Sequence, residues 1–359
     1  MKKKMSLLAL TGILAFGLTA GVSASDASET AAGKDTDMRK IIIDTDTGAD
    51  DATAIILAAC SPEVEIMGVT VLAGNVDLEQ GTKNALATLE LIGCDAPVYK
   101  GSEIRYDGSA ITLHSVFGAD GMGDMDLIHP EGSAEEEDAV SYILDTVRSN
   151  PGELEIVMRG PATNIARAID TDPKTMKQVK RIWSMGTPGI KGPGNASPVA
   201  EFNVYLDASA YRRVLDFGVP VTVIGLDVCD GESKWSDRDF EKLFAFGRVG
   251  QYVTNSFDKI REYYKNNGSA DSVMNCDGTA MMCVVCPEFI TESRLCHGSC
   301  ITDPGETYGQ VIFYQKGFTY DMTQEGEFDY NVTLVCDVAR MTCFMEYLTR
   351  MGSLIASVY

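Results

Sequence analysis

Residues 40–55 read Lys40-Ile-Ile-Ile-Asp-Thr-Asp-Thr-Gly-Ala-Asp-Asp-Ala-Thr-Ala-Ile55, with four carboxylates crowded into one turn. The β-branched run from Ile41 to Ile43 predicts a buried strand, and apolar residues at helical spacing follow from Ala52. Gly48 lets the backbone turn sharply between the two. The sequence here predicts a strand, an acidic turn and a helix in direct succession.

The acids of this turn are Asp44, Asp46, Asp50 and Asp51. We expect them to converge near the carboxyl end of a parallel strand, where α/β folds bind their ligands. Like charges so close together repel strongly unless a cation lies among them. Carboxylate oxygens suit a hard ion such as Ca²⁺ or Mg²⁺ better than zinc, which prefers nitrogen and sulfur. The turn therefore predicts a cation site.

Two other interpretations of the turn remain. Asp50 could cap the helix with Asp51 in its first turn, but this gives Asp44 and Asp46 no role. Asp44-Thr-Asp46-Thr also resembles the nucleophile loop of haloacid-dehalogenase-type phosphatases, in which an aspartate takes a phosphoryl group beside Mg²⁺. An acidic pair leading straight into a helix is not expected in that loop. A metal site in a protein that is not a phosphatase is therefore favoured.

Strand and helix patterns alternate along the rest of the chain. We predict strands at 64–72, 97–100, 154–158, 179–185, 219–226, 310–314 and 333–335, and helices at 78–92, 141–149, 163–169, 209–217, 240–264 and from near 278. This rhythm predicts an α/β, Rossmann-like fold with a mainly parallel sheet and helices on both faces. No linker rich in Pro or Gly interrupts it, so we expect one large domain over residues 39–359.

The N-terminus has the pattern of a secretory signal peptide over residues 1–24. Three lysines precede an apolar run at 7–21, and Val22-Ser23-Ala24 is a small-residue cleavage site. Residues 25–38 lack apolar periodicity and predict a flexible leader. The apolar run is too short and interrupted for a membrane span, so we expect a secreted or extracytoplasmic soluble protein.

The charge balance limits the classes of molecule that the protein is expected to bind. A net charge of −22, from 52 acids against 30 bases, opposes binding to nucleic-acid polymers or anionic membranes, which Lys and Arg must neutralise. A neutral small molecule is the better partner.

The chain has ten cysteines, most of them inside apolar segments. Cys283 and Cys286 fall on a predicted helix and read as buried core thiols. Cys296 and Cys300 flank His297 in what we expect to be a loop, where a disulfide or a metal site stays open.

Further polar clusters fall where predicted strands end. In chain order they are Ala73-Gly-Asn75, Gly160-Pro-Ala-Thr-Asn164, Asn195 with Glu201-Phe-Asn203, Gly225-Leu-Asp-Val228 and Cys276-Asp277. Together with the acidic turn they closely resemble the motifs of the inosine-uridine-preferring nucleoside hydrolases, and the resemblance runs from Arg39 to the C-terminus. It implies a Ca²⁺-dependent enzyme that cleaves the N-glycosidic bond of ribonucleosides.

The resemblance also implies roles for individual residues. Asp46, Asp51, the backbone carbonyl of Thr163 and Asp277 match the positions that hold Ca²⁺. The positions that bind ribose are matched by Asp50, Asn75, Asn195, Glu201, Asn203 and Asp277. A carboxylate such as Asp46 can take the proton of the attacking water, and a dense cage of acids and amides favours the positive charge that develops on the ribose.

The chain departs from the family pattern at the two positions that assist the departure of the base. Two histidines that can assist the leaving base in purine-cleaving relatives are replaced by Cys276 and Phe117. His114 or Tyr264 could supply the missing group, although a lone loop histidine is usually a surface residue and a helical tyrosine usually a core one.

We therefore expect an exported Ca²⁺-dependent nucleoside hydrolase that serves nucleoside salvage. The alternative is a nucleoside- or ribose-binding protein that keeps the cage but turns over little. Base preference and oligomeric state stay open, a homo-oligomer included.

Overall fold

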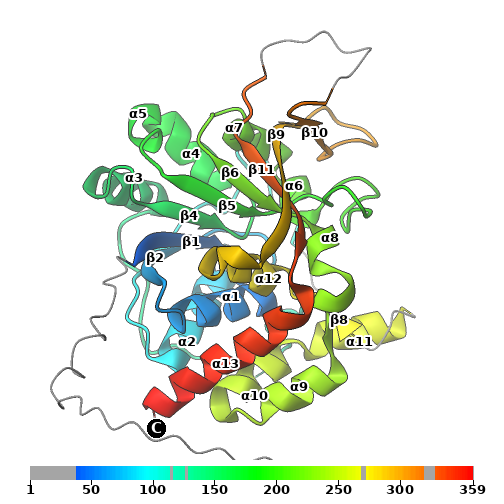
Figure 1. The fold of residues 1–359 in the computed structure, drawn as a ribbon. Coiled ribbons are helices and arrows are strands. Elements are labelled where there is room, and N and C mark those ends of the chain that lie inside the picture. The colour runs from blue at the N-terminus through cyan, green and yellow to red at the C-terminus, as the bar shows by residue number, and fades with distance from the viewer. Residues whose placement is uncertain (1–37, 114–115, 126–127, 268–271, 319–327, 359) are drawn as a thin grey trace, which may run out of the picture. The chain divides into compact units, whose positions relative to one another are not determined.

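Strand β1 (Arg39–Thr45) is buried on both faces because its isoleucines alternate between two hydrophobic cores. Ile41 and Ile43 belong to one core, and Ile42 belongs to the other. Burial on both faces is typical of a central strand in a parallel sheet covered by helices. Figure 1 shows this arrangement, with α3, α4, α5 and α7 on one side of the sheet and α1, α2, α12 and α13 on the other.

The structure is a computed structural model that describes residues 38–113, 116–125, 128–267, 272–318 and 328–358. The predicted signal peptide and residues 25–37 of the predicted leader lie outside these ranges. Residues 37–359 form one compact unit. Within the described part of the chain, every helix is too short or too polar to cross a bilayer.

Nine strands form the main sheet, in the order β10-β9-β11-β6-β5-β4-β1-β2-β3. Neighbours from β11 to β3 pair in parallel, whereas β9 pairs antiparallel with both β10 and β11. The further strands of this sheet are β2 (Val64–Val71), β3 (Val98–Lys100), β4 (Glu155–Met158), β5 (Arg181–Met185), β6 (Val221–Ile224), β9 (Ile290–Cys300), β10 (Val311–Gln315) and β11 (Val332–Val338). The expected α/β class and mainly parallel sheet are confirmed.

The helices fill the connections between the strands. They are α1 (Ala49–Ala59), α2 (Leu78–Ile92), α3 (Ala139–Ser149), α4 (Thr163–Thr171), α5 (Pro173–Met176), α6 (Phe202–Leu206), α7 (Ala208–Leu215), α8 (Leu226–Cys229), α9 (Asp237–Phe244), α10 (Gly247–Ser256), α11 (Asp258–Asn266), α12 (Cys276–Val285) and α13 (Arg340–Val358). Two short strands, β7 (Trp235–Ser236) and β8 (Ser272–Val273), make a separate antiparallel pair.

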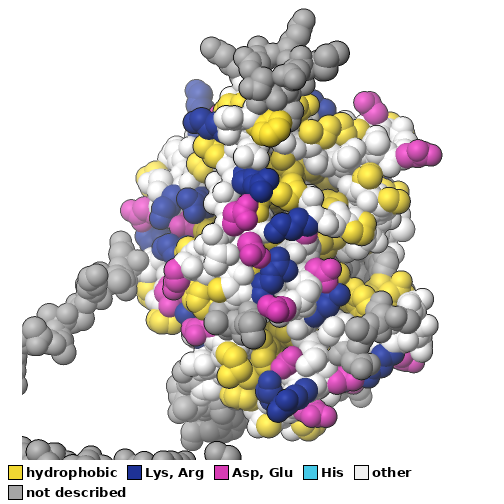
Figure 2. Space-filling model, turned by 45° about the vertical axis from the view of Figure 1, so that its right-hand side comes forward, with side chains coloured by type: hydrophobic (Ala, Val, Ile, Leu, Met, Phe, Trp, Pro, Cys, Tyr) yellow, Lys and Arg dark blue, Asp and Glu magenta, His cyan; other side chains and the backbone are white. Residues whose placement is uncertain are grey.

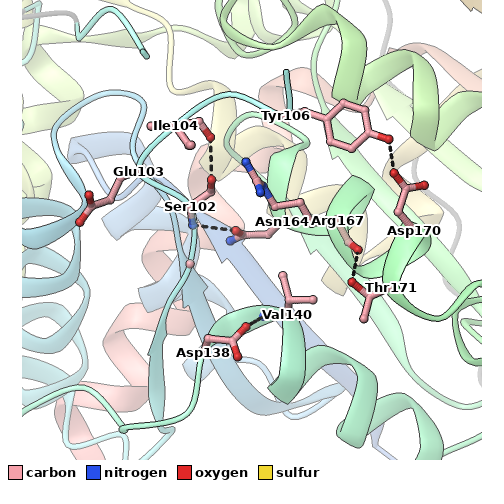
Figure 3. A pocket seen from close by; sticks show the side chains of 11 residues that line it. Ser102, Glu103, Ile104, Tyr106, Asp138, Val140, Asn164, Arg167, Asp170 and Thr171 are labelled. Atoms are coloured by element: carbon pink, nitrogen blue, oxygen red, sulfur yellow. Dashed lines mark hydrogen bonds between the residues drawn. The ribbon is translucent and has the colours of Figure 1, made fainter. Parts of the chain in front are cut away.

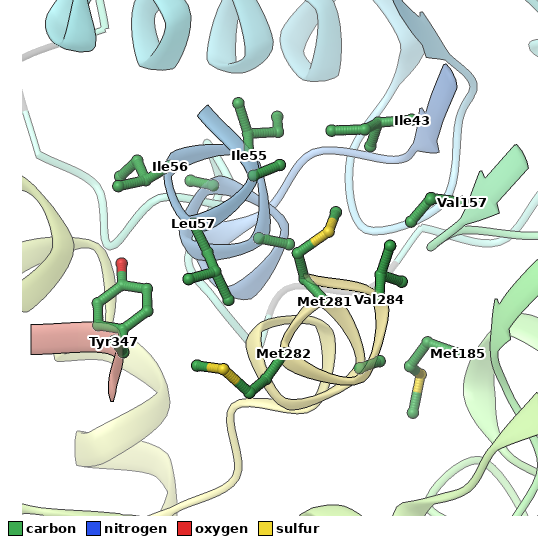
Figure 4. Close-up of a cluster of buried hydrophobic side chains, with 14 of the residues drawn as sticks. Ile43, Ile55, Ile56, Leu57, Val157, Met185, Met281, Met282, Val284 and Tyr347 are labelled. Atoms are coloured by element: carbon green, nitrogen blue, oxygen red, sulfur yellow. The ribbon is translucent and has the colours of Figure 1, made fainter. Parts of the chain in front are cut away.

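Helices α1 and α12 pack against each other in the larger core, although they lie far apart in the chain (Figure 4). Ile55 and Leu57 of α1 and Met281 and Val284 of α12 are all buried there. Burial of one such side chain stabilises the fold by about 1.5–3 kcal/mol. This contact fixes the start of α12, with Asp277, beside the start of α1.

The prediction of a loop around Cys296 and Cys300 is wrong. Both lie in β9, where Cys296, Gly298 and Cys300 are buried and the residues between them are partly exposed. The alternation was hidden because these residue types are not strong strand formers. All ten cysteines are free thiols, so no disulfide forms there.

Two predicted segments have different bounds in the structure. The helix expected over 240–264 is three helices, α9 to α11, since Gly247 takes a left-handed φ of 68° between the first two. The strand expected over 219–226 ends at Ile224, and Leu226 already begins α8.

Candidate active site

The predicted site residues come from chain segments that follow the carboxyl ends of the central strands. Asp46 directly follows β1, and Asn75 lies in the loop after β2. Because the neighbouring strands run parallel, their carboxyl ends meet at one edge of the sheet, which is where such folds bind ligands. Asp277 reaches the same place from the first turn of α12.

Three buried acids form the centre of the site. Ligand oxygens of Asp50, Asp51 and Asp277 all lie within 4.8 Å of one another, and this is the one such group of potential metal ligands among the described residues. The first two acids stand in the opening turn of α1, so its positive N-terminal end partly offsets their charge. The site therefore brings together two acids that the sequence predicts as metal ligands and one that it predicts for ribose.

Asp51 is held in place by three donors. Its Oδ1 accepts from Thr45 Oγ1 at 2.5 Å, and its Oδ2 accepts from Gly48 N at 2.9 Å and Asn75 Nδ2 at 3.1 Å. The cap of α1 is thus Gly48 with Asp51 folding back on it, and the interpretation of Asp50 as the cap is wrong. The carboxylate of Asp51 is fixed in direction before any ligand arrives.

Asp46 lies at the edge of this group, between two glycines. Its Oδ2 accepts from the backbone amide of Asn75 at 2.6 Å, and its Oδ1 is buried with no hydrogen-bond partner among the described residues. A Cβ at Gly74 would stand 2.1 Å from Oδ2, and one at Gly160 would stand 2.9 Å from Oδ1. Side chains at these two positions would collide with the carboxylate, so both glycines make room for it.

Burial raises the pKa of each acid in the group. For Asp46 and Asp277 the pKa rises well above its ordinary value, first through burial and then through the charge of Asp51. Burial, followed by the same neighbour, raises the pKa of Asp50 to about 7. Oδ1 of Asp277 is also buried without a partner among the described residues. Several acids that destabilise one another's charge, with free oxygens, are suited to a bound cation.

The remaining acid of the turn, Asp44, has its own donors. Thr70 Oγ1 and Asn164 Nδ2 both donate to its Oδ1, at 2.6 and 2.8 Å. It is absent from the close group formed by Asp50, Asp51 and Asp277. Its side chain ties β1 to β2 and α4 through Oδ1, while Oδ2 is buried with no hydrogen-bond partner among the described residues.

Thr163 is buried and is the first residue of α4. Its Oγ1 donates to Asp207 Oδ2 at 2.7 Å.

Three further residues predicted to bind ribose, Asn195, Glu201 and Asn203, lie in or just before α6. Glu201 caps this helix, accepting from Asn203 N at 2.9 Å and Val204 N at 3.1 Å, and burial raises its pKa to about 7. Asn203 donates from Nδ2 to the carbonyl of Arg159 at 2.7 Å. Asn195 is exposed, and its Oδ1 accepts from Phe202 N at 2.8 Å. Both amides are thus already oriented by protein contacts.

On the side expected for the leaving base, Cys276 opens α12 and its carbonyl accepts from Cys229 Sγ at 3.7 Å. Burial raises the pKa of Tyr264 to about 12, with smaller contributions from the charges of Cys276 and Asp50. Phe117 packs edge-on against Phe257, with ring centroids 6.3 Å apart. His114 lies outside the described residues.

Sequence reasoning missed Arg159, whose side chain is fully buried and whose charge interacts with those of Asp277 and Asp51. The available signal was a charged residue placed directly between an apolar strand and the Gly160-Pro turn. A cation at that point of a parallel sheet faces the ligand edge.

A separate pocket of about 680 Å³ lies between the 101–106 loop, α3 and α4 (Figure 3). None of the predicted site residues lines it. Asn164 stands between the two regions, since its Oδ1 accepts from Ser102 N at 3.0 Å while its Nδ2 donates to Asp44.

Comparison with known proteins agrees with this geometry. A family model described as inosine-uridine preferring nucleoside hydrolase matches residues 41–343. An uncharacterised protein of Schizosaccharomyces pombe is 44% identical over 308 residues, covering 82% of this chain and 97% of that protein. Uridine nucleosidase 1 of Arabidopsis thaliana is 32% identical over 278 residues, covering 74% and 82%.

Among solved structures, the purine-preferring ribonucleoside hydrolase from Gardnerella vaginalis has a TM-score of 0.80 at 29% identity, covering 88% of this chain and 99% of its own. The chain belongs to the inosine-uridine preferring nucleoside hydrolase family and is a hydrolase that acts on the N-glycosyl bonds of nucleosides.

Proposed function

We propose that this protein is an exported, Ca²⁺-dependent nucleoside hydrolase that releases the free base and ribose for salvage. The observation that carries the metal dependence is the buried group of Asp50, Asp51 and Asp277, with Asp46 beside it. An all-oxygen set of this kind fits Ca²⁺, and the Oδ1 atoms of Asp46 and Asp277, which have no hydrogen-bond partner among the described residues, could act as ligands.

Asp46, Asp51 and Asp277, with a backbone carbonyl that the sequence assigns to Thr163, would hold the ion. When bound, Ca²⁺ would neutralise the acids and make a water or hydroxyl at the site more acidic. Asp51 has the most fixed position of the three acids, because three donors orient it.

Asp46 is suited to take the proton of the attacking water. The amide of Asn75 holds its Oδ2, which leaves the buried Oδ1 free to accept. General bases of this kind typically contribute about 10²–10⁴-fold to the rate. Asp50, Asn75, Asn195, Glu201 and Asn203 would bind the ribose hydroxyls. The acids would then stabilise the positive charge that the ribose acquires as the bond breaks.

Leaving-group assistance has two candidates in the structure. Cys276 stands near the acids, and its pKa is raised well above the ordinary value, first by contact with Cys229 and then by burial. Tyr264 is protonated at neutral pH, as any tyrosine is, and burial raises its pKa further, to about 12. Both groups are weak acids, so they would assist an ordinary base less than a histidinium does.

The names of the relatives point to different bases. One relative is a uridine nucleosidase, and a solved neighbour is purine-preferring. We therefore propose ribonucleosides as a class. The partner would be a small molecule: on the face shown in Figure 2, Lys and Arg are interspersed with Asp and Glu instead of forming a basic patch.

The second candidate function is a nucleoside- or ribose-binding protein with little turnover. It is favoured by the replacement of both base-side histidines by Cys276 and Phe117, the latter packed into an aromatic contact. The ribose cage does not depend on those two positions.

One experiment separates the two functions. Purified protein is incubated with uridine, cytidine, inosine, adenosine and guanosine in Ca²⁺ or in chelator, and free base and ribose are followed by chromatography. We expect release that requires Ca²⁺. Binding measured by calorimetry without any release would instead establish the binding protein, and equal release in chelator would refute the calcium dependence.

Export is tested separately. The full chain is expressed in a bacterium, and the protein from the medium or periplasm is analysed by mass spectrometry. Cleavage after Ala24 is the expected result, and an intact N-terminus on cytoplasmic protein would refute the proposal.

A further inference from the structure

Arg159 is the one lysine or arginine classed as buried in the part of the chain that the structure describes. It directly follows β4, its backbone amide donates to the carbonyl of Asp44 at 2.7 Å, and its own carbonyl accepts from Asn203 Nδ2 at 2.7 Å. The backbone is therefore fixed on both sides. None of the three guanidinium nitrogens has a hydrogen-bond partner among the described residues.

The groups that act on this guanidinium are the acids of the site. Burial lowers the pKa of the Arg159 guanidinium, and the charges of Asp277 and Asp51 oppose this shift by favouring its cationic form. Burying an unpaired cation is costly, and a cation in the interior is normally balanced by acids close by. Asp277 Oδ1 also lacks a hydrogen-bond partner among the described residues, so the guanidinium and this carboxylate interact through their charges and not through a hydrogen bond.

We infer that Arg159 is a built-in counter-cation of the acid group, which neutralises Asp51 and Asp277 when no metal is bound and sets how tightly the metal binds. The part concerning the metal rests on the proposed calcium site. Arg159 is a positioning residue, since it acts through the two acids and has no assigned contact with the nucleoside.

Two consequences follow from the position of the charge. A fixed cation beside a cation site repels the incoming ion, so it weakens Ca²⁺ binding. The same cation keeps the acids from repelling one another in the metal-free protein, which keeps the site assembled. Thus Arg159 lowers the metal affinity and raises the stability of the metal-free fold.

The first test measures Ca²⁺ affinity by calorimetry on the purified protein. Arg159→Met keeps much of the length of the side chain and removes the charge, whereas Arg159→Lys keeps the charge and serves as the matched control. We expect Arg159→Met to bind Ca²⁺ at least about tenfold more tightly, and Arg159→Lys to stay within about threefold of the wild type. Unchanged or weaker Ca²⁺ binding by Arg159→Met would overturn the metal part of the inference.

The second test is independent of the metal. Melting temperatures are measured in chelator for the wild type, Arg159→Met, Asp277→Asn and the double variant. Removing the acid should be less destabilising, or more stabilising, when Arg159 has already been removed, because the attraction between the two is then lost. Additive effects of the two substitutions would show that the guanidinium does not pair with this acid, and would overturn the inference.

Arg159→Gln replaces Arg159→Met in both tests if the methionine variant does not fold. A wild type that binds no Ca²⁺ would refute the proposed calcium site, while the cycle in chelator would still decide whether Arg159 balances the acids.

Discussion

Asn75 and Asp46 are 29 positions apart in the chain, yet the backbone amide of Asn75 donates to Asp46 Oδ2 at 2.6 Å. The contact is made because β1 and β2 are parallel neighbours whose carboxyl ends meet at one edge of the sheet. It orients the carboxylate so that Oδ1 stays free.

Asp46→Asn should remove most of the turnover, because an amide cannot accept the proton of the attacking water. We expect kcat for uridine to fall by about 10²–10⁴-fold, measured by chromatography of the free base. The control is Asp303→Asn, a charge change at an exposed loop residue, which should leave kcat as in the wild type. A loss smaller than about tenfold would contradict the role of Asp46 as base.

Asp51→Ala should leave the fold largely intact and abolish binding of Ca²⁺ and ribose. The variant removes a carboxylate from the close group and also the acceptor for Gly48 N, so Ca²⁺ affinity should fall by roughly 100-fold or more. Calorimetry measures both affinities, and circular dichroism checks the fold. Asp51→Asn removes the charge but keeps an oxygen that can accept from Gly48 N. Comparing the two variants therefore distinguishes loss of the charge from loss of the helix cap. Unchanged affinities would rule out the proposed cage.

Substrates whose base leaves easily should be cleaved much faster than ordinary purine nucleosides, because Cys276 and Phe117 replace two groups that can donate a proton. We compare kcat/KM for p-nitrophenyl riboside and inosine. A ratio of at least about 10² in favour of the activated riboside is expected.

Cys276→His should raise the turnover of inosine more than that of p-nitrophenyl riboside, with Cys343→Ser as a thiol substitution away from the acids. Tyr264→Phe tests the other candidate donor. If the wild type already cleaves both substrates at equal rates, another group must be supplying the proton.

Stability should depend on pH more strongly without Ca²⁺ than with it. Burial raises the pKa of Asp44, Asp50 and Glu201 to about 7, whereas unfolded carboxyl groups titrate near about 4. The folded metal-free protein therefore binds more protons than the unfolded chain between these values. The stability from these protonated groups is present below about pH 4 and is lost as the pH rises through about 7.

The melting temperature measured in chelator should consequently fall by roughly 5 °C or more between pH 5 and pH 8. With saturating Ca²⁺ the decrease should be smaller, because a cation beside Asp50 would favour the charged form of that acid. A metal-free protein that becomes more stable over the same range would contradict the pKa directions given for the site.

Much of the fold followed from local patterns in the sequence. The isoleucines of β1 predict a buried strand, and the apolar spacing of α1 and α2 predicts helices. The structure has all three elements where they were expected. Strand β9 and helix α6 were not predicted. Glycine, serine and cysteine in β9 have weak strand preferences, and α6 is only five residues long.

The residues of the candidate site also fall into two groups, those placed by the local sequence and those placed by tertiary packing. The sequence alone determined that Asp46, Asp50 and Asp51 lie together, because a short turn between a strand and a helix leaves them no room to separate. Only the tertiary structure decided that Asp277 and Arg159 join them. Asp277 arrives through the packing of α12 on α1, and Arg159 through the pairing of β4 with β1. Such contacts depend on side-chain packing between segments far apart in the chain, which local residue preferences do not encode.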